Sequence, residues 1–576
     1  GYGRKGLIIS LFLSILPLWF LIRSTGDAVS FFEHRIGILL TFGGLACWRW
    51  GWFMTQAVRA IIYRYIVYPI FRRQGRKAVA TVGGVPEVII LATTYKEKPW
   101  ITNVVFRSVY EELAKIKGLE KAPTIVLATG CDEDDVAMKK VHEQYSTVGA
   151  SGFEPQLILV RGDQGKRKAI GSALYEVQKL KPNSDGVIVF MDGDSLFRPG
   201  CMQAILPIFR LEPKVDAVTT NEDGYSKGPR WFAEWITLRF GLRHRTMCSI
   251  SLSGKLLCLT GRMSAFRTGV AMNNDFIEQV HNDTLDHWLW GKFDMLSGDD
   301  KSTWFWLAKN GSRMLYVPDA LVTTIEVVEK QAFQRAFANL KRWSGNTIRN
   351  SSRVIKLGPR KLGWFLWWSV VDQRVSMFTV LFGPVMALMA ILVGDFDLAL
   401  AFLVWVIYSR FIHASISWYH GRRFSIVYVP VQVLSEWTMA IIKIWTLFHP
   451  ASQRWFNRGN RTMDTTQGNS FFKLRKYYAN YLVVFSFAVL IWTVSHVTGL
   501  VNIPREIILP RISRSQGNES TPDQLVGTVP ASNYFGYRQN PVSSKTDLTL
   551  QRPAPMISEA EVNTDADHTQ FFGYSK

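Results

Sequence analysis

Two carboxylates stand at a spacing that suits metal chemistry. Asp192-Gly193-Asp194 comes directly after the apolar run 187–190. A pair of this kind can share a hard divalent cation that also holds a diphosphate, although an ordinary Asp-Gly turn has the same sequence. The segment therefore offers a metal site with Asp192 and Asp194 as ligands and Mg²⁺ or Mn²⁺ as the ion.

Two further polar segments carry groups for proton transfer and for phosphate binding. Asp299-Asp300 offers a general base, or only a helix cap. Lys166 and Lys168 belong to a Gly-Lys-Arg-Lys segment that could cradle phosphate at a helix start or form a solvated basic face. It is not a Walker loop, because the GxxxxGK(S/T) spacing is absent.

The remaining candidates also occupy short polar segments. Asp132 opens an acidic run, 132–135, in which one acid could hold a nucleobase or ribose, although a partly solvated turn explains the run as well. His281 and His287 lack a ligand partner at helical spacing, so we interpret them as structural. The five cysteines form no CxxC pair, which argues against both a zinc site and a disulfide framework. The other candidate side chains are Thr94, Glu97, Arg262, Arg342 and Trp343.

Strand-like and helical patterns alternate in the middle of the chain and would position these groups. β-Branched runs occur at 88–93, 124–128, 157–160 and 187–190, separated by helical segments at 102–117, 135–145 and 166–180. This alternation predicts an α/β domain with a mostly parallel sheet and helices on both faces. Ligands of such sheets bind at the carboxyl ends of the strands. We therefore expect the polar segments to converge on one edge of the sheet.

Apolar stretches near both ends of the 576-residue chain predict a multi-pass membrane protein. About 20 apolar residues cross the hydrocarbon core. The stretches of suitable length are Gly6–Ile22, Ile36–Met54, Val375–Val393, Leu398–Ile412 and Tyr481–Leu500. Phe424–Phe448 contains Glu436 and Lys443, and the basic segment after it favours the cytoplasm, so we predict that it is interfacial or re-entrant.

These patterns divide the chain into regions. The net charge of +21 indicates polyanionic partners, but the basic residues cluster beside the expected spans, which argues against nucleic acid. We expect an N-terminal membrane region with two spans at 1–74, a cytoplasmic α/β domain at 75–330, interfacial helices at 331–373, a C-terminal membrane region at 374–502 with a cytoplasmic loop at 449–480, and a mostly disordered tail at 503–576.

The order of these motifs resembles that of processive, membrane-embedded family-2 glycosyltransferases with a GT-A fold, the group of cellulose, chitin and hyaluronan synthases. The resemblance implies that Asp192 and Asp194 bind metal and nucleotide diphosphate, and that Asp300 is the catalytic base. It also implies Arg342 on the diphosphate and Trp343 against the acceptor sugar, in a Q-x-x-R-W motif whose Gln position holds Asn339.

The polar residues after the predicted strands supply the surroundings of this site. We expect the nucleotide-sugar pocket to include Thr94, Glu97, Asp132, Lys166 and Lys168. Arg262 and Asp299 are the candidates for the acceptor side. Trp455 and Arg458 are similar to the W-G-T-R-type gating loop of the family, with Phe and Asn in place of Gly and Thr.

Within that family, segments 260–264, 297–304 and 341–346 are most similar to the bacterial mannuronan synthases. This similarity implies GDP-mannuronate as donor, a β-1,4-linked polymannuronate product moved across the inner membrane, and a cyclic-di-GMP-binding partner subunit. The alternatives are a hyaluronan, cellulose or chitin type of synthase that uses a UDP-sugar, or a lipid-directed transferase that adds one sugar. A transporter or scaffold with a degenerate transferase domain fits less well, because acids stand at every expected strand end.

Overall fold

The computed structural model describes residues 36–162, 165–328, 331–419, 425, 427–453 and 470–500. The chain divides into two compact units, Gly1–Ile507 and Ile508–Lys576, and the described residues all belong to the first. The expected span Gly6–Ile22, the gating-loop residues Trp455 and Arg458, and the tail 503–576 lie outside the described residues.

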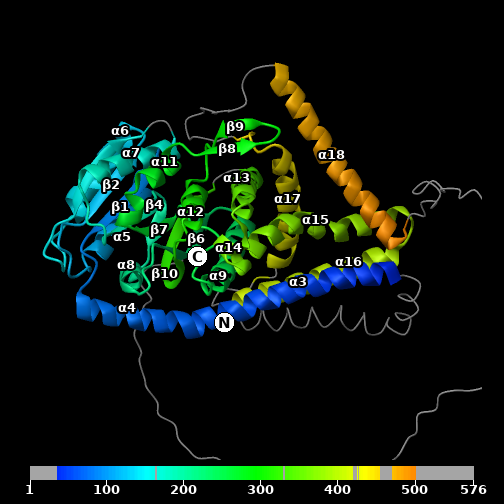
Figure 1. Cartoon of the computed structure of the whole chain (residues 1–576), viewed down its shortest axis with the longest axis horizontal. Coiled ribbons are helices and arrows are strands. Elements are labelled where there is room, and N and C mark those ends of the chain that lie inside the picture. Colours follow the sequence, from blue (N-terminus) through cyan, green and yellow to red (C-terminus); the bar gives the residue numbers. More distant parts are fainter. Residues whose placement is uncertain are drawn as a thin grey trace, which may run out of the picture. The chain divides into compact units, whose positions relative to one another are not determined.

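An eight-stranded sheet in the order β3-β2-β1-β4-β7-β6-β10-β5 forms the centre of the α/β domain (Figure 1). β3, β2, β1 and β4 pair in parallel, as do β6 and β10, whereas β7 is antiparallel to both its neighbours and β5 is antiparallel to β10. The mostly parallel sheet expected from the sequence is therefore present. Its strands are β1 (Val88–Thr94), β2 (Thr124–Thr129), β3 (Gln156–Arg161), β4 (Val187–Asp192), β5 (Ser195–Phe197), β6 (Ala217–Lys227), β7 (Met263–Arg267) and β10 (Met314–Val327).

Helices follow the first three strands, as the alternating pattern predicted. They are α5 (Pro99–Leu113), α6 (Asp132–Tyr145) and α7 (Lys166–Lys179). Each residue of 88–92 is at most 1% exposed. A strand that is apolar at every position fits only a sheet covered on both faces, which is why continuous apolar runs, and not alternating ones, identified these strands.

The strand order reverses between β1 and β4, because the chain moves outward through β2 and β3 and then returns to the other side of β1. Crevices at such points are the usual ligand sites of open α/β sheets. The two strand ends are in close contact here, since the Gly193 N–H donates to the carbonyl of Thr93 at 3.0 Å. A Cβ at Gly193 would lie 2.9 Å from that carbonyl oxygen, so only glycine fits between the two carboxylates.

A second set of helices, together with a small two-stranded sheet, completes the α/β domain. α9 packs against β6, and α12 packs against both α11 and α13. The set consists of α8 (Cys201–Ile205), η2 (Leu206–Arg210), α9 (Arg230–Ser251), α10 (Thr268–Ala271), α11 (Asn274–His281), β8 (Thr284–His287), β9 (Gly291–Asp294), α12 (Asp299–Lys309), α13 (Ala332–Ile355) and α14 (Gly358–Leu362).

Three described helices are long and apolar enough to cross a membrane. Their apolar segments are Trp364–Leu392, Phe396–Ala414 and Phe472–Thr498, which contain or closely match the expected C-terminal spans. The first begins 11 residues before Val375, inside the region expected to be interfacial. The helices of this region are α15 (Trp364–Leu392), α16 (Phe396–Tyr419), α17 (Tyr428–Phe448) and α18 (Ser470–Thr498).

Two other long helices are not among these three. α3 (Ile36–Ile62) contains the expected span Ile36–Met54 and continues through η1 (Tyr63–Val67) into α4 (Tyr68–Val82). Its Arg49 forms an ion pair with Asp372 of α15 at 2.9 Å, so this charge is compensated within the protein. α17 covers most of Phe424–Phe448, and its interfacial or re-entrant placement stays a prediction.

Candidate active site

Three charged groups from distant parts of the sequence meet at the carboxyl edge of the sheet. The Nζ of Lys166, at the start of α7, lies 2.6 Å from Oδ1 of Asp192, at the end of β4. The same Nζ lies 3.1 Å from Oδ2 of Asp299, at the start of α12. A Cβ at Gly261 would lie 2.8 Å from this Nζ, so the backbone approaches the pair closely. The convergence expected from strand ends is therefore present for these groups.

The Lys166–Asp192 pair is partly buried and electrostatically balanced. Burial disfavours the charged forms of both groups, but the neighbouring charges together outweigh that penalty. Asp192 and Asp299 together raise the pKa of Lys166 above its usual value. Lys166 in turn lowers the pKa of Asp192. Both groups are therefore ionised at neutral pH, and a bound ligand or cation would have to compete with Lys166 for the Asp192 carboxylate.

Asp194 has the opposite electrostatic setting. Burial, followed by repulsion from Asp192 and Glu97, raises its pKa to about 7. Its Oδ1 is buried and has no hydrogen-bond partner in the described part of the chain. A buried, unpartnered carboxylate oxygen next to a second acid fits a divalent cation, which would supply the missing positive charge.

The protein supplies few ligands for such a cation. In the described part of the chain, no group of three or more His, Cys, Asp or Glu side chains is placed to hold a metal ion. Asp192 and Asp194 can therefore provide two carboxylates, and the remaining positions would be filled by oxygen atoms of a ligand or of water. Divalent cations that are shared with substrate phosphates are commonly bound in this way.

Asp300 lies in the first turn of α12, where Gly298 adopts a φ of +89° just before the helix. Burial raises the pKa of Asp300, and the neighbouring Asp299 raises it further against the opposing effect of Lys301 and Lys166. Asp299 and Asp300 line a small cavity that also includes Lys166. A carboxylate of raised pKa beside the charged cluster has the chemistry of a general base.

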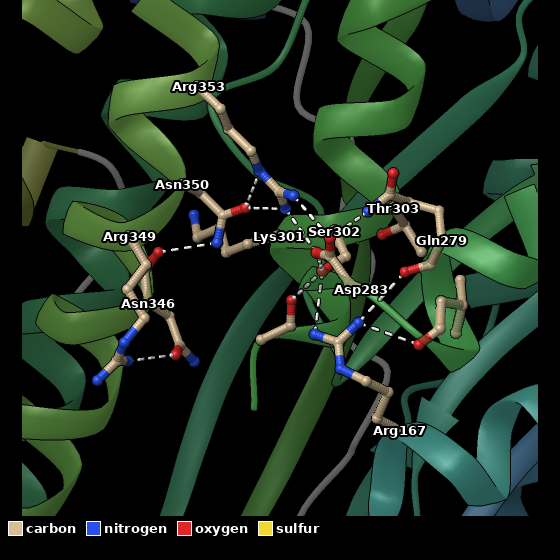
Figure 2. Close-up of polar contacts among 12 residues, drawn as sticks. Arg167, Gln279, Asp283, Lys301, Ser302, Thr303, Asn346, Arg349, Asn350 and Arg353 are labelled. Carbon is tan, nitrogen blue, oxygen red and sulfur yellow. Dashed lines mark hydrogen bonds and ion pairs between the residues drawn. The ribbon is translucent and has the colours of Figure 1, made fainter. Parts of the chain in front are cut away.

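A buried network holds α12 in place (Figure 2). Arg353 of α13 donates to both carboxylate oxygens of Asp283, at 2.7 and 2.6 Å. Ser302 of α12 donates to the same carboxylate and accepts from Arg167 at 3.0 Å. Arg167 also donates to the carbonyl of Ser297 at 3.3 Å. The turn that carries Asp300 is therefore fixed from α7 on one side and from α13 on the other.

This network was not foreseen in the sequence. Arg167 was considered only as part of a phosphate-binding or solvated segment, and Asp283 belongs to no recognisable motif. The partners are 70 residues apart for Arg353 and Asp283 and 135 apart for Arg167 and Ser302. No spacing signal along the chain links residues so far apart.

A second set of contacts joins the turn before α12 to segment 450–453, at the start of the predicted loop 449–480. Arg349 of α13 donates to the carbonyls of Pro450 and Ser452 at 2.7 and 3.2 Å. Gln453 donates to the carbonyl of Asp294 at 2.8 Å and accepts from the N–H of Leu296 at 3.1 Å. Segment 450–453 is thereby tied to the strand and turn that lead into α12.

Aromatic and cationic side chains gather around Trp343. Its ring stacks against Trp235 of α9, with centroids 5.9 Å apart and planes 24° apart. The guanidinium carbons of Arg239 and Arg262 lie 4.7 and 5.8 Å from the Trp343 ring. Arg262 also pairs with the buried Glu222 at 3.2 Å. This surface suits a sugar ring that carries polar or anionic groups.

Arg342 and Asn339 occupy the same helix, α13. Burial lowers the pKa of Arg342, while Asp192 opposes this effect, so the guanidinium senses the carboxylate at the end of β4. Asn339, which replaces the Gln of the family motif, is buried and donates to Glu326 at 3.1 Å. It therefore anchors α13 to the end of β10.

Lys168 and Asp132 have partners outside the Lys166–Asp192 pair. Lys168 donates to Asn282, and the 92%-exposed Asp132 pairs with Arg161 at 2.5 Å. Asp134 is the buried acid of its segment and accepts from the N–H groups of Lys96 and Glu97 at 2.8 and 3.3 Å. It thus holds the loop after β1, and the nucleotide-binding roles of Lys168 and Asp132 stay predictions.

Thr94 lies at the end of β1, beside the carboxylate pair. Its side chain is buried, and its Oγ1 has no hydrogen-bond partner in the described part of the chain. A Cβ at Gly193 would lie 3.2 Å from the Cβ of Thr94, which places this hydroxyl next to the Asp192–Asp194 turn. The unpartnered hydroxyl is available to a ligand at the strand ends.

Comparisons with known proteins agree with this geometry. Residues 86–346 match the family model described as "Glycosyltransferase like family 2". Glycosyltransferase alg8 of Pseudomonas syringae pv. tomato is 33% identical over 438 residues, which cover 75% of this chain and 87% of the relative. Glycosyltransferase alg8 of Azotobacter vinelandii is 30% identical over 419 residues, which cover 72% and 83%.

One similar solved structure is that of the mannosyltransferase PcManGT from Pyrobaculum calidifontis in complex with GDP-Man and Mn²⁺. It is 16% identical in sequence, with a TM-score of 0.36, and the match covers 68% of this chain and 98% of that protein. The family match, the relatives and the sheet identify the chain as a glycosyltransferase of family 2 with a GT-A fold. More narrowly, the chain belongs to the family of the Alg8 glycosyltransferases.

Proposed function

We propose that the protein transfers mannuronate from GDP-mannuronate to the end of a growing β-1,4-linked polymannuronate, with inversion at the anomeric carbon. The relationship to Alg8 supports an alginate-type glycosyltransferase. The observation that carries the proposal is the partly buried Lys166–Asp192–Asp299 cluster beside Asp300, at the point where the strand order of the sheet reverses.

The donor side of the site would hold the nucleotide diphosphate. Asp192 and Asp194 would bind a divalent cation, Mg²⁺ or Mn²⁺, which offsets negative charge on the departing diphosphate when bound. Arg342, whose guanidinium senses Asp192, would donate to phosphate oxygens. Lys166 lies at the N-terminus of α7, where the backbone N–H groups also favour anions.

Asp300 would act on the acceptor. The hydroxyl at the end of the polymer must lose a proton as it attacks the anomeric carbon, and Asp300 is the buried carboxylate placed to accept it. Its raised pKa makes it a stronger base than an exposed aspartate. Trp343 would support the acceptor sugar ring, with Arg262 beside it. A single displacement of this kind inverts the anomeric centre.

The transfer site would be coupled to export of the polymer across the bacterial inner membrane, with the α/β domain in the cytoplasm. A cavity of about 710 Å³ is lined by residues of α3, α9, α15, α16 and α17. Arg239 stacks on Trp343, and its Nη1 lies 3.3 Å from Sδ of Met439, which lines this cavity. These contacts support a path from Trp343 into the membrane helices.

The proposal also includes a partner. By its relationship to the alginate synthases, the chain would work with a cyclic-di-GMP-binding subunit. Segment 450–453, which is tied to the turn before α12, is where a signal from the adjacent loop would reach the catalytic base.

Labelled donor tests the proposed chemistry. Membranes that contain the protein would receive labelled GDP-mannuronate with Mg²⁺ or Mn²⁺, and the product would be digested with a mannuronate-specific lyase. We expect lyase-sensitive polymer whose labelling is reduced by unlabelled GDP-mannuronate and not by UDP-sugars. Polymer formed only from a UDP-sugar, or a single sugar added to lipid, would contradict the proposal.

A further inference from the structure

The cavity next to the transfer site has more positive than negative side chains. Its two carboxylates, Asp372 and Glu436, are already paired: Arg49 lies 2.9 Å from Asp372 and Arg410 lies 2.6 Å from Glu436. Arg245 also lines the cavity, as does Lys443. Neither of these two forms an ion pair within 4.0 Å in the described part of the chain.

Arg245 is enclosed by protein and incompletely hydrogen-bonded. Its Nε and Nη1 atoms are buried and have no hydrogen-bond partner among the described residues. Its guanidinium carbon lies 4.4 Å from the Phe53 ring, whose face it covers. Burial lowers the pKa of Arg245 to about 10, so the side chain remains charged at neutral pH.

Arg239, six residues earlier on the same helix, shows the same imbalance. It contacts Trp343 and Met439 but forms no ion pair with a described carboxylate. Burial, followed by repulsion from Arg262, lowers its pKa to about 10. Six residues correspond to roughly 9 Å along an α-helix, so α9 carries two separate charges, with Arg239 beside Trp343 and Arg245 in the lining of the cavity.

Unpaired buried charges are costly, which indicates a ligand. Removing a charge from water without a partner is strongly unfavourable, and proteins usually compensate such a charge with a counter-charge. Here Arg49 and Arg410 have carboxylate partners within 4.0 Å, whereas Arg239, Arg245 and Lys443 have none that close among the described residues.

Aromatic residues define the shape of the expected ligand. Trp50, Phe53, Trp405 and Trp437 line the same cavity. Trp50 packs edge-on against Phe53 and Trp405, with ring centroids 5.4 and 6.2 Å apart. Aromatic side chains beside cations suit a ligand whose rings offer C–H faces and carry carboxylates at intervals, which describes a polymer of sugar acids.

We propose that Arg239, Lys443 and Arg245 form a carboxylate-binding site that selects an anionic polysaccharide over a neutral one as the polymer leaves Trp343. The inference rests on the proposed function, because the ligand is the product of transfer. It adds a specificity determinant outside the nucleotide-sugar pocket, on α9 and α17.

Oligosaccharide binding by the purified full-length protein tests this site. The probes are a β-1,4-linked hexamannuronate and the neutral β-1,4-linked mannohexaose, compared at low and high salt. We expect the wild-type protein to prefer the anionic hexamer. Arg245→Gln and Lys443→Gln should each weaken its binding by about tenfold, the effect of one lost charge-assisted hydrogen bond. Binding of mannohexaose should change by less than about twofold.

Two further variants serve as controls. Arg230→Gln removes an 84%-exposed arginine of the same helix and should leave both affinities unchanged. Arg245→Lys keeps the charge and should retain most of the preference, which separates loss of charge from loss of folding. The inference is wrong if the wild-type protein binds both hexamers equally, or if the Gln variants weaken both to the same extent.

Two further measurements, binding to lipid vesicles and turnover of the donor, complete the design. If phosphatidylglycerol vesicles, and not hexamannuronate, bind less well to Arg245→Gln, the cavity binds lipid phosphate and the inference is overturned. Release of GDP from GDP-mannuronate by the wild-type protein, in the presence of its partner subunit, is measured in parallel. Absence of turnover with a retained preference would contradict the proposed function alone, whereas turnover without a preference would contradict this inference alone.

Discussion

The donor side of the site and the cavity beside it differ in whether their cationic side chains have carboxylate partners. At the donor side, Lys166 is compensated by Asp192 and Asp299 within hydrogen-bonding distance. In the cavity, Arg245 and Lys443 have no carboxylate partner among the described residues. The donor side can therefore persist without ligand at little electrostatic cost, whereas the cavity gains most from an anionic occupant.

This difference suits the donor side to positioning the reacting groups and the cavity to selecting the ligand. A cluster that is already ionised and fixed needs no rearrangement of charge when a nucleotide sugar binds, which favours positioning. A cavity with uncompensated cations discriminates between ligands by charge, which favours specificity. Variants on the donor side should therefore mainly lower the rate of transfer, whereas variants in the cavity should mainly lower the selectivity for an anionic ligand.

Removing the base should have the largest effect. Asp300→Asn is expected to lower polymer formation by about 10³-fold, because the acceptor hydroxyl loses its proton acceptor. Binding of GDP-mannuronate, measured by calorimetry, should change by less than about twofold. The control is Asp275→Asn, which alters an exposed acid on α11 and should keep full activity. Near-normal synthesis by Asp300→Asn would remove Asp300 from the mechanism.

Removing the lysine of the cluster should come next. Lys166→Gln leaves Asp192 and Asp299 without their shared cation, and we expect kcat/KM to fall by about 10²-fold. Because Lys166 lowers the pKa of Asp192, its loss should raise that pKa and move the acidic limb of the pH–rate profile to higher pH. A profile with an unmoved acidic limb would show that the pair does not control Asp192.

The network around Asp283 should control positioning. Asp283→Asn leaves Arg353 without its carboxylate, and we expect kcat to fall by about tenfold with the KM for donor unchanged, because α12 loses its anchor. Thermal unfolding should show a loss of about 3–5 kcal/mol. The matched control is Glu111→Gln in the exposed Arg107–Glu111 pair, which should cost less than about 1 kcal/mol. A rise in KM with kcat intact would assign Asp283 to binding.

Binding of the cation should depend on pH through Asp194. With its pKa raised to about 7, the Asp194 carboxyl is only half ionised near pH 7, and the ligating, ionised form is lost progressively below that pH. The apparent Kd for Mn²⁺ should therefore increase by up to about tenfold for each pH unit below 7. Titration by electron paramagnetic resonance at pH 5.5 to 8 measures this, with Asp194→Asn as the control that should abolish the dependence. An equal Kd across this range would mean that Asp194 does not bind the ion.

The positions of the strand ends could be predicted from the sequence because they depend on two simple features. A continuous apolar run identifies a buried strand, and chain direction brings its carboxyl end to the ligand edge. These features predicted the convergence of Lys166, Asp192 and Asp299. They did not predict the direction of Lys168, since neighbours on a helix face different sides and its partner is Asn282, 114 residues away.

Other features could not be predicted because they depend on tertiary packing alone. Whether Arg245 lacks a carboxylate is decided by α3, α16 and α17, which meet only in the fold. The Arg353–Asp283 pair likewise joins α13 to the turn after α11. Sequence patterns identify which groups are present, whereas the pairing of charges requires coordinates.

The central claim is that a single chain joins a uronate-transferring site to a path through the membrane. It is tested most directly with purified protein, and its partner subunit, in inverted membrane vesicles supplied with labelled GDP-mannuronate. The account predicts lyase-sensitive polymer that becomes protected from external lyase inside the vesicles, and no such polymer with Asp300→Asn. Polymer that stays fully accessible outside the vesicles, or no polymer from this donor, would contradict it.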